Sequence, residues 1–284
     1  MFFLEKWLDL SYPRIMGVLN TTPDSFFDGG NLYRNGKIDL DLALIQAEDM
    51  VSNGAAILDI GGESTRPGAK PISNEEEFDR VVPIVESIAS RIDVVISVDT
   101  SKPKIMESAI SSGAHMINDV KALSEPHALE VVSASNVNVC LMHMLGNPMT
   151  MQISPEYKSV NNEVKQFLID RIEKCKQVGI SRERLIVDPG FGFGKTVDHN
   201  LDLLENLRDL ATLGCPILVG LSRKSMINKI LKRDIIDSLP ATLGLVAIAV
   251  ERGANLIRAH DVRETADVIS MWMAVNRVEN DSES

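Results

Sequence analysis

Polar and ionisable residues recur along this 284-residue chain, each close behind a short apolar run. In chain order they are Asn20, Asp59 with Glu63, Asp99, Asn118, His143, Asp188, the Ser222-Arg223-Lys224-Ser225 set, and Arg258 with His260. Carboxylates and amides can hold a flat polar ring through paired hydrogen bonds, whereas clustered cations suit an anion. A helix cap or a turn explains one such ending, but not eight in order. We therefore expect these residues to share one site.

The apolar runs themselves predict eight buried parallel strands. They are short, mostly rich in β-branched residues and not alternating, which is typical of strands covered on both faces. They span residues 15–19, 56–60, 94–98, 115–117, 137–142, 185–187, 216–221 and 254–257. Segments with helical periodicity separate them, at 39–52, 75–91, 102–112, 163–178, 198–210 and 241–251.

This alternation predicts an α/β fold, a single (β/α)8 TIM barrel in one domain over residues 1–284, with a core of about 14–275 and a polar tail at 278–284. The carboxyl ends of barrel strands converge on one mouth, where the polar residues would meet. A doubly wound sheet is the structural rival, but it would need fewer strands and one switch point. Long βα loops after strands 1, 2 and 5, at 21–38, 61–74 and 144–162, are expected to be lids or binding loops.

Composition argues against several kinds of partner. The net charge of -11 disfavours nucleic acid and anionic membrane surfaces, so cations that bind an anionic ligand must be clustered locally. No apolar stretch approaches the roughly 18 residues of a membrane span, and the N-terminal segment is charged too early for a signal peptide. Cys140, Cys175 and Cys215 form no paired motif, which predicts reduced thiols in a cytoplasmic protein.

The glycine-rich segment 188–196 imitates two nucleotide-binding motifs and fits neither. A phosphate-binding P-loop would need glycine at position 189, which is Pro189. The dinucleotide motif would need glycine at position 195, which is Lys195. We interpret these glycines as making room for a flat ligand beside the backbone, with Phe193 lining the pocket.

Eight segments, in order, resemble the sequence blocks of the dihydropteroate synthase family. The two most distinctive are MGVLNTTPDSFFDGG at 16–30 and DIGGESTRPG at 59–68. The others lie at 97–100, 117–120, 142–152, 188–195, 220–225 and 258–262. The resemblance covers residues 14–275. It implies a barrel enzyme of folate biosynthesis that condenses 6-hydroxymethyl-7,8-dihydropterin pyrophosphate with 4-aminobenzoate and releases pyrophosphate.

The same resemblance implies a role for particular residues. The pterin would be bound by Asp99, Asn118, Met142, Asp188, Phe193, Lys224 and Arg258. The 4-aminobenzoate would be bound by Thr65, Arg66, Pro67 and Ser225. The pyrophosphate would be bound by Asn20, Thr65, Arg258 and His260, with Asn20 also binding Mg²⁺. Catalysis would depend on Asp99, Lys224, Arg258 and His260.

Residue chemistry supports parts of this assignment independently. A carboxylate can meet the amino and ring nitrogens of a pterin with two parallel hydrogen bonds, and Asp188 is the best candidate. Arg258 and His260 lie on the same side of an extended chain after the eighth strand, where barrels frequently bind phosphate. A single Asn20 oxygen suffices for Mg²⁺ when phosphates supply the other ligands. We also expect a dissociative substitution in which the bond to pyrophosphate breaks first. It demands no strong general base, because the arylamine is already neutral, and the absence of an obvious nucleophile–base pair from the eight blocks agrees with this.

Alternatives stay open at this point. A pterin-dependent methyltransferase barrel would share the pterin-binding residues but has no use for a pyrophosphate clamp. A relative that binds pterin without catalysis is a second alternative. At single positions, Asp99 could be a helix N-cap and Arg66 a solvated loop cation. A homodimer is implied by the resemblance alone, and sensitivity to sulfonamides, as analogues of 4-aminobenzoate, is left open.

Overall fold

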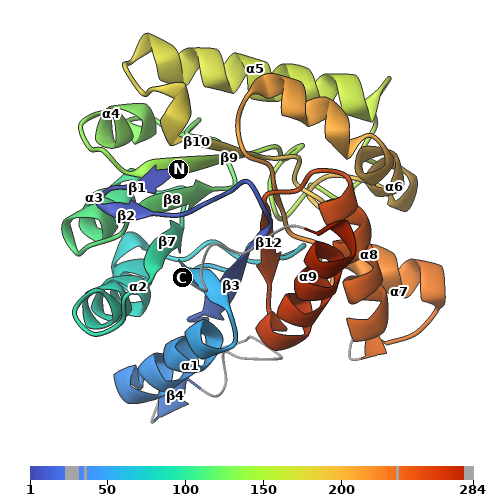
Figure 1. The fold of residues 1–284 in the computed structure, drawn as a ribbon. Coiled ribbons are helices and arrows are strands. Elements are labelled where there is room, and N and C mark those ends of the chain that lie inside the picture. Colours follow the sequence, from blue (N-terminus) through green and yellow to red (C-terminus); the bar gives the residue numbers. More distant parts are fainter. Residues whose placement is uncertain (23–31, 35–36, 235–236, 278–284) are drawn as a thin grey trace.

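Eight parallel strands form the centre of the computed structural model, which describes residues 1–22, 32–34, 37–234 and 237–277 (Figure 1). They are β3 (Arg14–Asn20), β6 (Ala55–Gly61), β7 (Val95–Asp99), β8 (Met116–Asp119), β9 (Asn138–Met142), β10 (Leu185–Asp188), β11 (Leu218–Val219) and β12 (Leu256–Ala259). Their order is β10-β9-β8-β7-β6-β3-β12-β11, and a parallel bridge from Val187 to Ile217 brings the two ends together. The predicted (β/α)8 TIM barrel is confirmed, and each predicted strand overlaps an observed one.

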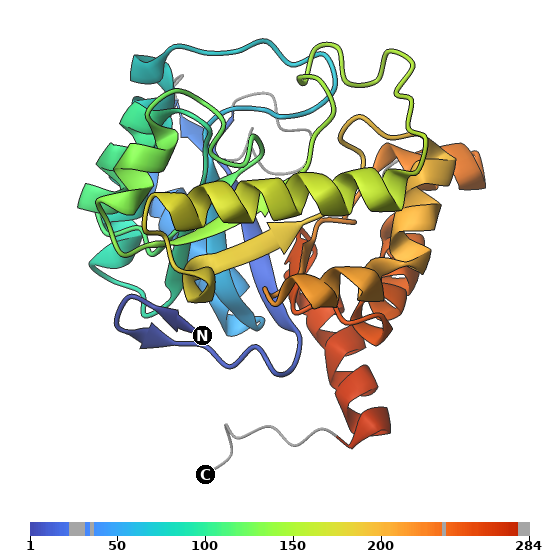
Figure 2. The ribbon, with the colours of Figure 1, turned by 90° about the horizontal axis from the view of Figure 1, so that it is seen from above.

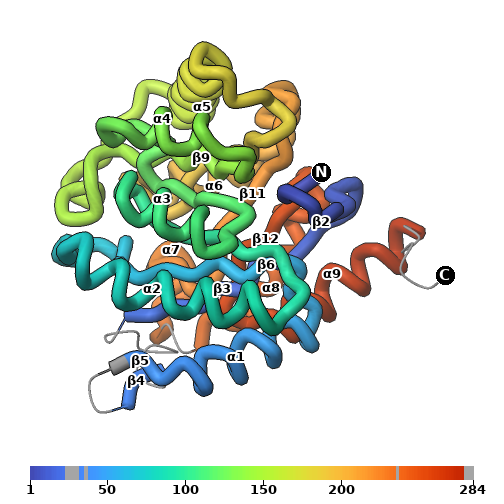
Figure 3. The backbone as a smooth tube through the Cα atoms, turned by 90° about the vertical axis from the view of Figure 1, so that its left-hand side faces the viewer, coloured from blue at the N-terminus to red at the C-terminus, as the bar shows by residue number. Residues whose placement is uncertain are grey.

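Helices cover the outside of the barrel (Figures 1 and 3). They are α1 (Leu40–Ser52), α2 (Asn74–Ala89), α3 (Pro103–Ser111), α4 (Ala128–Ser133), α5 (Val160–Gln177), α6 (Val197–Glu205), α7 (Ser225–Leu231), α8 (Leu239–Glu251) and α9 (Val262–Asn276). Two 3-10 segments, Arg182–Arg184 and Leu207–Leu213, complete the layer. The six predicted helical segments overlap helices, although the end of 198–210 lies in the second 3-10 segment. The sequence pattern did not predict α4 or α9.

One end of the barrel is sealed by apolar side chains. Each strand contributes one residue to this floor: Met16, Ile57, Val95, Met116, Cys140, Ile186, Leu218 and Leu256. An N-terminal hairpin of β1 (Phe2–Phe3) and β2 (Lys6–Trp7) inserts Phe3 against them. Figure 2 shows this hairpin at the end of the barrel opposite the long loops. Because this end is filled, the other end of the barrel is the one left for a ligand.

The inward-facing positions become polar closer to the mouth. Side chains alternate along a strand, so the residue two positions after each floor residue also faces the interior. In this second layer lie Asp59, Ser97, Asn118, Asp188 and Arg258. Several of the polar residues that end the apolar runs, among them Asp59, Asn118 and Asp188, therefore lie together in this second layer.

Two of the predicted long loops are described in full. They follow β6 and β9, and the Gly68 amide donates to the Pro148 carbonyl at 3.0 Å, which links one loop to the other. In the loop after β3, a short hairpin of β4 (Tyr33–Arg34) and β5 (Lys37–Ile38) is described. Residues 23–31 and 35–36 of that loop and the tail 278–284 lie outside the described residues. No helix in the described part of the chain combines the length and apolarity that a membrane crossing requires.

Candidate active site at the mouth of the barrel

Arg258 on β12 links two carboxylates at the barrel mouth. Its Nε donates to Asp59 Oδ2 at 2.6 Å, and its Nη2 donates to Asp99 Oδ2 at 3.0 Å. Burial disfavours the charged guanidinium, but the two carboxylates outweigh this and raise the pKa of Arg258. The side chain is still 23% exposed, so part of the guanidinium can meet a ligand.

Asp59 connects β6 with three other strands, β7, β8 and β12, below the mouth. Its side chain is fully buried, and Oδ1 accepts a hydrogen bond from Ser97 at 2.7 Å. Its Oδ2 accepts from Asn118 Nδ2 at 3.0 Å as well as from Arg258. A buried carboxylate is stable only with such partners. The sequence pattern includes Asp59 in the polar series but assigns it no role in the site. The sequence signal that could have identified Asp59 as a site residue was its place in that polar series.

Asp188, which is buried, and Lys224, which is half-buried, provide a second pair of charges at the mouth. Burial raises the pKa of Asp188 to about 6, although the nearby Gly190 amide and Lys224 oppose the shift. The Gly190 amide donates to Asp188 Oδ1 at 2.7 Å. Among the described residues no hydrogen bond reaches Oδ2, which leaves that oxygen available as an acceptor. Burial lowers the pKa of Lys224 to about 8, and its ammonium lies 4.3 Å from the centroid of the Phe193 ring.

Asp99 and Asn118 lie side by side on the neighbouring strands β7 and β8. They are paired in register between β7 and β8, and both are buried. Burial raises the pKa of the Asp99 carboxyl, Arg258 opposes that shift, and Asp59 adds to it. Lys102, not Asp99, is the N-cap residue of the following helix, α3, so the N-cap alternative for Asp99 is wrong. The carboxylate is turned toward Arg258 instead.

Cations surround His260. Burial lowers the pKa of its imidazole to about 3, and the positive charges of Arg258, Arg223, Arg66 and Lys224 lower it further. Its Nδ1 contacts Ser222 Oγ at 3.0 Å. Without an anion, this histidine is neutral near pH 7, so its contribution to an anion site would begin as a hydrogen-bond donor. A bound anion would favour its protonation.

The remaining predicted site residues lie around this layer. Met142 ends β9, is buried and pairs in register with Asp188. Ser225 is exposed and begins α7, directly after Lys224. Thr65 is half-buried, and Arg66 and Pro67 are exposed, all on the loop after β6. Arg66 lies close enough to His260 to influence its pKa, which ties this loop to the cation cluster.

Asn20 is the predicted metal ligand, and it ends β3 beside Gly61 of β6. Within the described residues, no group of three or more His, Cys, Asp or Glu side chains is arranged to hold a metal ion. A lone amide oxygen fits Mg²⁺ only when the substrate's phosphates supply most of the other ligands. The residues present are therefore compatible with a metal ion that arrives with a diphosphate.

Two of the glycines after β10, Gly190 and Gly194, are explained by contacts with protein backbone. A Cβ on Gly190 would lie 1.9 Å from the carbonyl oxygen of His143, and one on Gly194 would lie 2.5 Å from that of Leu145. Both glycines also have positive φ. The interpretation that they make room for a ligand is thus wrong at these two positions. The loop after β9 packs there instead.

Lys195 is a buried cation that the sequence pattern left without a role. Its ammonium donates to the carbonyls of Gly190 at 2.9 Å and Phe193 at 3.0 Å, and it contacts His143 Nδ1 at 3.0 Å. Burial lowers its pKa to about 7. These contacts hold the segment that carries Asp188 and Phe193. Lys195 therefore supports the site without facing the ligand.

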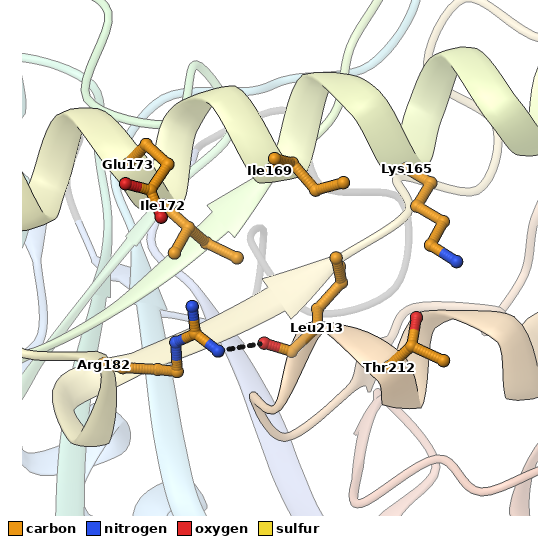
Figure 4. A pocket seen from close by; sticks show the side chains of 7 residues that line it. All are labelled: Lys165, Ile169, Ile172, Glu173, Arg182, Thr212 and Leu213. Atoms are coloured by element: carbon orange, nitrogen blue, oxygen red, sulfur yellow. Dashed lines mark hydrogen bonds between the residues drawn. The ribbon is translucent and has the colours of Figure 1, made fainter.

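A separate cavity of about 140 Å³ lies outside the barrel, between α5 and the second 3-10 segment (Figure 4). Its wall includes Ile169 and Ile172 of α5 and Arg182, which donates to the Leu213 carbonyl at 3.2 Å. It is lined by none of the residues of the barrel mouth.

The fold and the mouth define an enzyme of the pterin-binding (β/α)8-barrel class, and a family profile described as "Pterin binding enzyme" matches residues 16–260. Dihydropteroate synthase of Escherichia coli K12 is 50% identical over 262 residues, which is 92% of this chain and 91% of that protein. This chain therefore belongs to the dihydropteroate synthase family, and it is a transferase.

Solved structures of dihydropteroate synthases agree with this family assignment. A Yersinia pestis dihydropteroate synthase in complex with a sulfonamide drug has a TM-score of 0.91 and 46% identity, over 95% of this chain and 97% of that one. A Xanthomonas albilineans dihydropteroate synthase in complex with 7,8-dihydropteroate has a TM-score of 0.84 and 40% identity, over 96% and 97%. The family assignment sets aside the methyltransferase and non-catalytic alternatives.

Proposed function

We propose that this chain condenses 6-hydroxymethyl-7,8-dihydropterin pyrophosphate with 4-aminobenzoate, which yields 7,8-dihydropteroate and pyrophosphate for folate biosynthesis. The observation that carries the proposal is a single mouth with two kinds of site. Buried carboxylates suited to a flat polar ring lie beside a cluster of cations suited to a diphosphate. The Xanthomonas albilineans relative was solved with 7,8-dihydropteroate, the proposed product.

The pterin would lie between the strands that carry Asp188, Asn118 and Asp99. Asp188 Oδ2, which has no partner in the described part of the chain, supports a role as acceptor for the pterin amino group. Lys224 would donate to ring acceptors, and its position over Phe193 restrains it. Arg258 would stack on the ring, and Met142 would line the pocket beside Asp188.

The pyrophosphate would bind Arg258, His260, Thr65 and Asn20. Mg²⁺ held by Asn20 and the phosphates would neutralise part of the diphosphate charge. His260 starts neutral and donates a hydrogen bond, and it gains a proton more readily once the anion is bound. The local cations compensate for a chain whose net charge is -11.

The substitution would be dissociative. The bond between the pterin methylene carbon and the leaving oxygen breaks first, and its electron pair departs with pyrophosphate, which Arg258 and His260 stabilise. Asp188 and Asp99 stabilise the resulting pterin cation. The neutral arylamine nitrogen then attacks the methylene carbon and releases a proton to solvent, so no strong general base is required. Closure of the loop after β6 would exclude competing water. The loop after β3 has the same predicted role, but residues 23–31 and 35–36 of it lie outside the described residues.

The 4-aminobenzoate would enter beside the loop after β6. Its carboxylate would be held by Ser225, with Thr65, Arg66 and Pro67 closing over the ring. Arg66 is exposed on this loop and lies near His260, which supports a position between the carboxylate and the diphosphate.

Two copies of the chain would form a homodimer, and α8 and α9 offer the surface. They expose Ile248, Met271 and Val275. Light scattering coupled to size exclusion measures the mass directly, and a monomer at micromolar concentration would argue against this part of the proposal. The three buried free cysteines suit a reducing, cytoplasmic setting.

The function is tested by incubating the protein with dihydropterin pyrophosphate, 4-aminobenzoate and Mg²⁺ and detecting dihydropteroate. Failure to form it would exclude the proposed reaction. A sulfonamide that competes with 4-aminobenzoate would locate the arylamine site. Pyrophosphate release without arylamine supports the dissociative route, whereas strict dependence of bond cleavage on the arylamine would indicate direct displacement.

A further inference from the structure

We propose that Lys102 is a positioning residue for the arylamine substrate, because its ammonium group holds together the two ends of the loop after β6 (residues 62–73, called the β6–α2 loop below). This inference rests on the proposed function, which places Thr65, Arg66 and Pro67 of the β6–α2 loop over the arylamine. Lys102 itself lies on a different connection, between β7 and α3.

Lys102 and Glu63 together close the base of the β6–α2 loop. Glu63 Oε1 accepts a hydrogen bond from the Ile72 amide at 3.0 Å, and its Oε2 lies 3.1 Å from Lys102 Nζ. Lys102 Nζ also donates to the Ile72 carbonyl at 2.8 Å. One ammonium group thus contacts both ends of the loop, and the segment between Glu63 and Ile72 becomes a closed ring.

The ammonium group is itself anchored to a buried carboxylate. Lys102 Nζ lies 2.7 Å from Glu77 Oε2, and the Glu77 side chain on α2 has no exposure at all. Glu77 Oε1 accepts a hydrogen bond from Thr100 Oγ1 at 2.6 Å. Burial disfavours the charge on Lys102, but Glu77 and Glu63 more than compensate and raise its pKa. Separation of this pair would leave the buried Glu77 carboxylate without a compensating charge, so the pair resists opening.

The anchor also connects the loop to the pterin side of the mouth. Thr100 directly follows Asp99, and its amide donates to the Asn118 carbonyl at 3.1 Å. The same short segment therefore carries a predicted pterin carboxylate and the support for the arylamine loop. This arrangement gives the loop a fixed position relative to the pterin pocket.

The tip of the β6–α2 loop has much weaker support. Arg66, Pro67 and Gly68 are exposed. A contact beyond the loop is the hydrogen bond from the Gly68 amide to Pro148 at 3.0 Å. The tip therefore takes its position mainly from its base. Loss of the Lys102 ammonium should let the tip move, while Asp188, Asn118 and Lys224 keep their own contacts.

The test compares Lys102→Met with Lys104→Met, an exposed lysine two positions later on α3. We expect Lys102→Met to raise the KM for 4-aminobenzoate by about tenfold or more, with the dissociation constant of the pterin substrate changed less than about twofold. Amide hydrogen exchange over residues 62–72 should accelerate. Lys102→Arg should restore much of the KM, and Lys104→Met should change neither quantity.

A second variant keeps the test valid if Lys102→Met fails to fold. Lys102→Met with Glu77→Gln removes the ammonium without leaving a buried unpaired carboxylate, so it should fold and show the same rise in KM. An unchanged arylamine KM in either folded variant, or an equal loss of affinity for both substrates, would overturn the inference. Absence of turnover in the wild-type protein would instead refute the proposed function, and hydrogen exchange would still report whether Lys102 holds the loop.

Discussion

Binding at the barrel mouth depends on individual ionisable residues whose pKa values lie close to neutral pH. Burial raises the pKa of Asp188 to about 6 and lowers that of Lys224 to about 8, and it also raises the pKa of Asp99. Such shifts are common where residues perform binding or catalysis, because a ligand can supply the missing partner. Modest changes of pH should therefore alter function before they unfold the protein.

Pterin affinity should fall as the pH drops through about 6. The ionised form of Asp188 is the one that accepts hydrogen bonds, and its raised pKa means that protonation begins well above the ordinary range of an aspartate. Protonation of Asp99, also favoured by burial, acts in the same direction. Calorimetric titration of the pterin from about pH 5 to 8 measures this. A pterin affinity that does not change with pH would contradict the role of Asp188. The Asp188→Asn variant should bind the pterin weakly at every pH.

Asp59→Asn should lower kcat by about 10- to 100-fold, because Arg258 loses the charge that orients its guanidinium. The amide keeps the size of the side chain, so the fold should survive. Steady-state kinetics with both substrates check this, with Asp79→Asn on the exposed face of α2 as the control. If Asp59→Asn reduces only stability and leaves kcat unchanged, the residue has a purely structural role.

At the scale of elements, the site depends on two interlocked loops. The loop after β9 donates from Gln152 Nε2 to the Gly192 carbonyl at 2.6 Å and from the Tyr157 hydroxyl to the Gly194 carbonyl at 2.8 Å. Lys195 Nζ also holds the segment after β10 through the carbonyls of Gly190 and Phe193. The ligand groups of that segment are therefore positioned by hydrogen bonds from side chains to its backbone carbonyls.

Gly190→Ala should destabilise the protein far more than Gly179→Ala. Both glycines have positive φ, so both substitutions share a backbone cost of about 1 kcal/mol. Only at Gly190 would the new Cβ also meet a carbonyl oxygen, at 1.9 Å, whereas nothing lies within 4 Å at Gly179. Denaturant unfolding should show a further loss of about 1 to 3 kcal/mol. Equal losses of unfolding free energy in the two variants would mean that the loop after β9 shifts to accommodate the new Cβ.

At the scale of the whole molecule, the barrel has one closed and one open end. The N-terminal hairpin and the floor residues fill one end, and the long loops surround the other (Figure 2). Substitutions in the floor should therefore affect stability without affecting the reaction. Stability and reaction are separated in this way because the floor residues and the residues of the mouth lie at different positions along every strand.

Phe3→Ala should lower the free energy of unfolding by about 3 to 5 kcal/mol, because its side chain is completely buried against the floor. The KM for both substrates should stay the same. Phe2→Ala is the matched control, since Phe2 is 63% exposed on the same hairpin. If the two variants unfold at the same denaturant concentration, the hairpin does not seal the barrel.

The sequence by itself determined the eight strands and the polar end of each. Both are local properties, since an unbroken apolar run marks a strand buried on two faces and its last residues mark the mouth. The order of the sequence blocks also determined the family. Short elements carried weaker signals, as α4 has six residues and β1 and β2 have two each. The longer α9 was missed although its buried Val262, Thr265, Ile269 and Met273 follow a helical spacing.

Only the tertiary structure decided which polar residues bind one another. Asp59 and Arg258 are 199 positions apart, and they meet because β6 and β12 both pair with β3. The shifted pKa values arise from burial, and the need for glycine at position 190 arises from a carbonyl on another loop. No local pattern encodes these contacts, because each depends on two segments that are distant in the chain and adjacent in space.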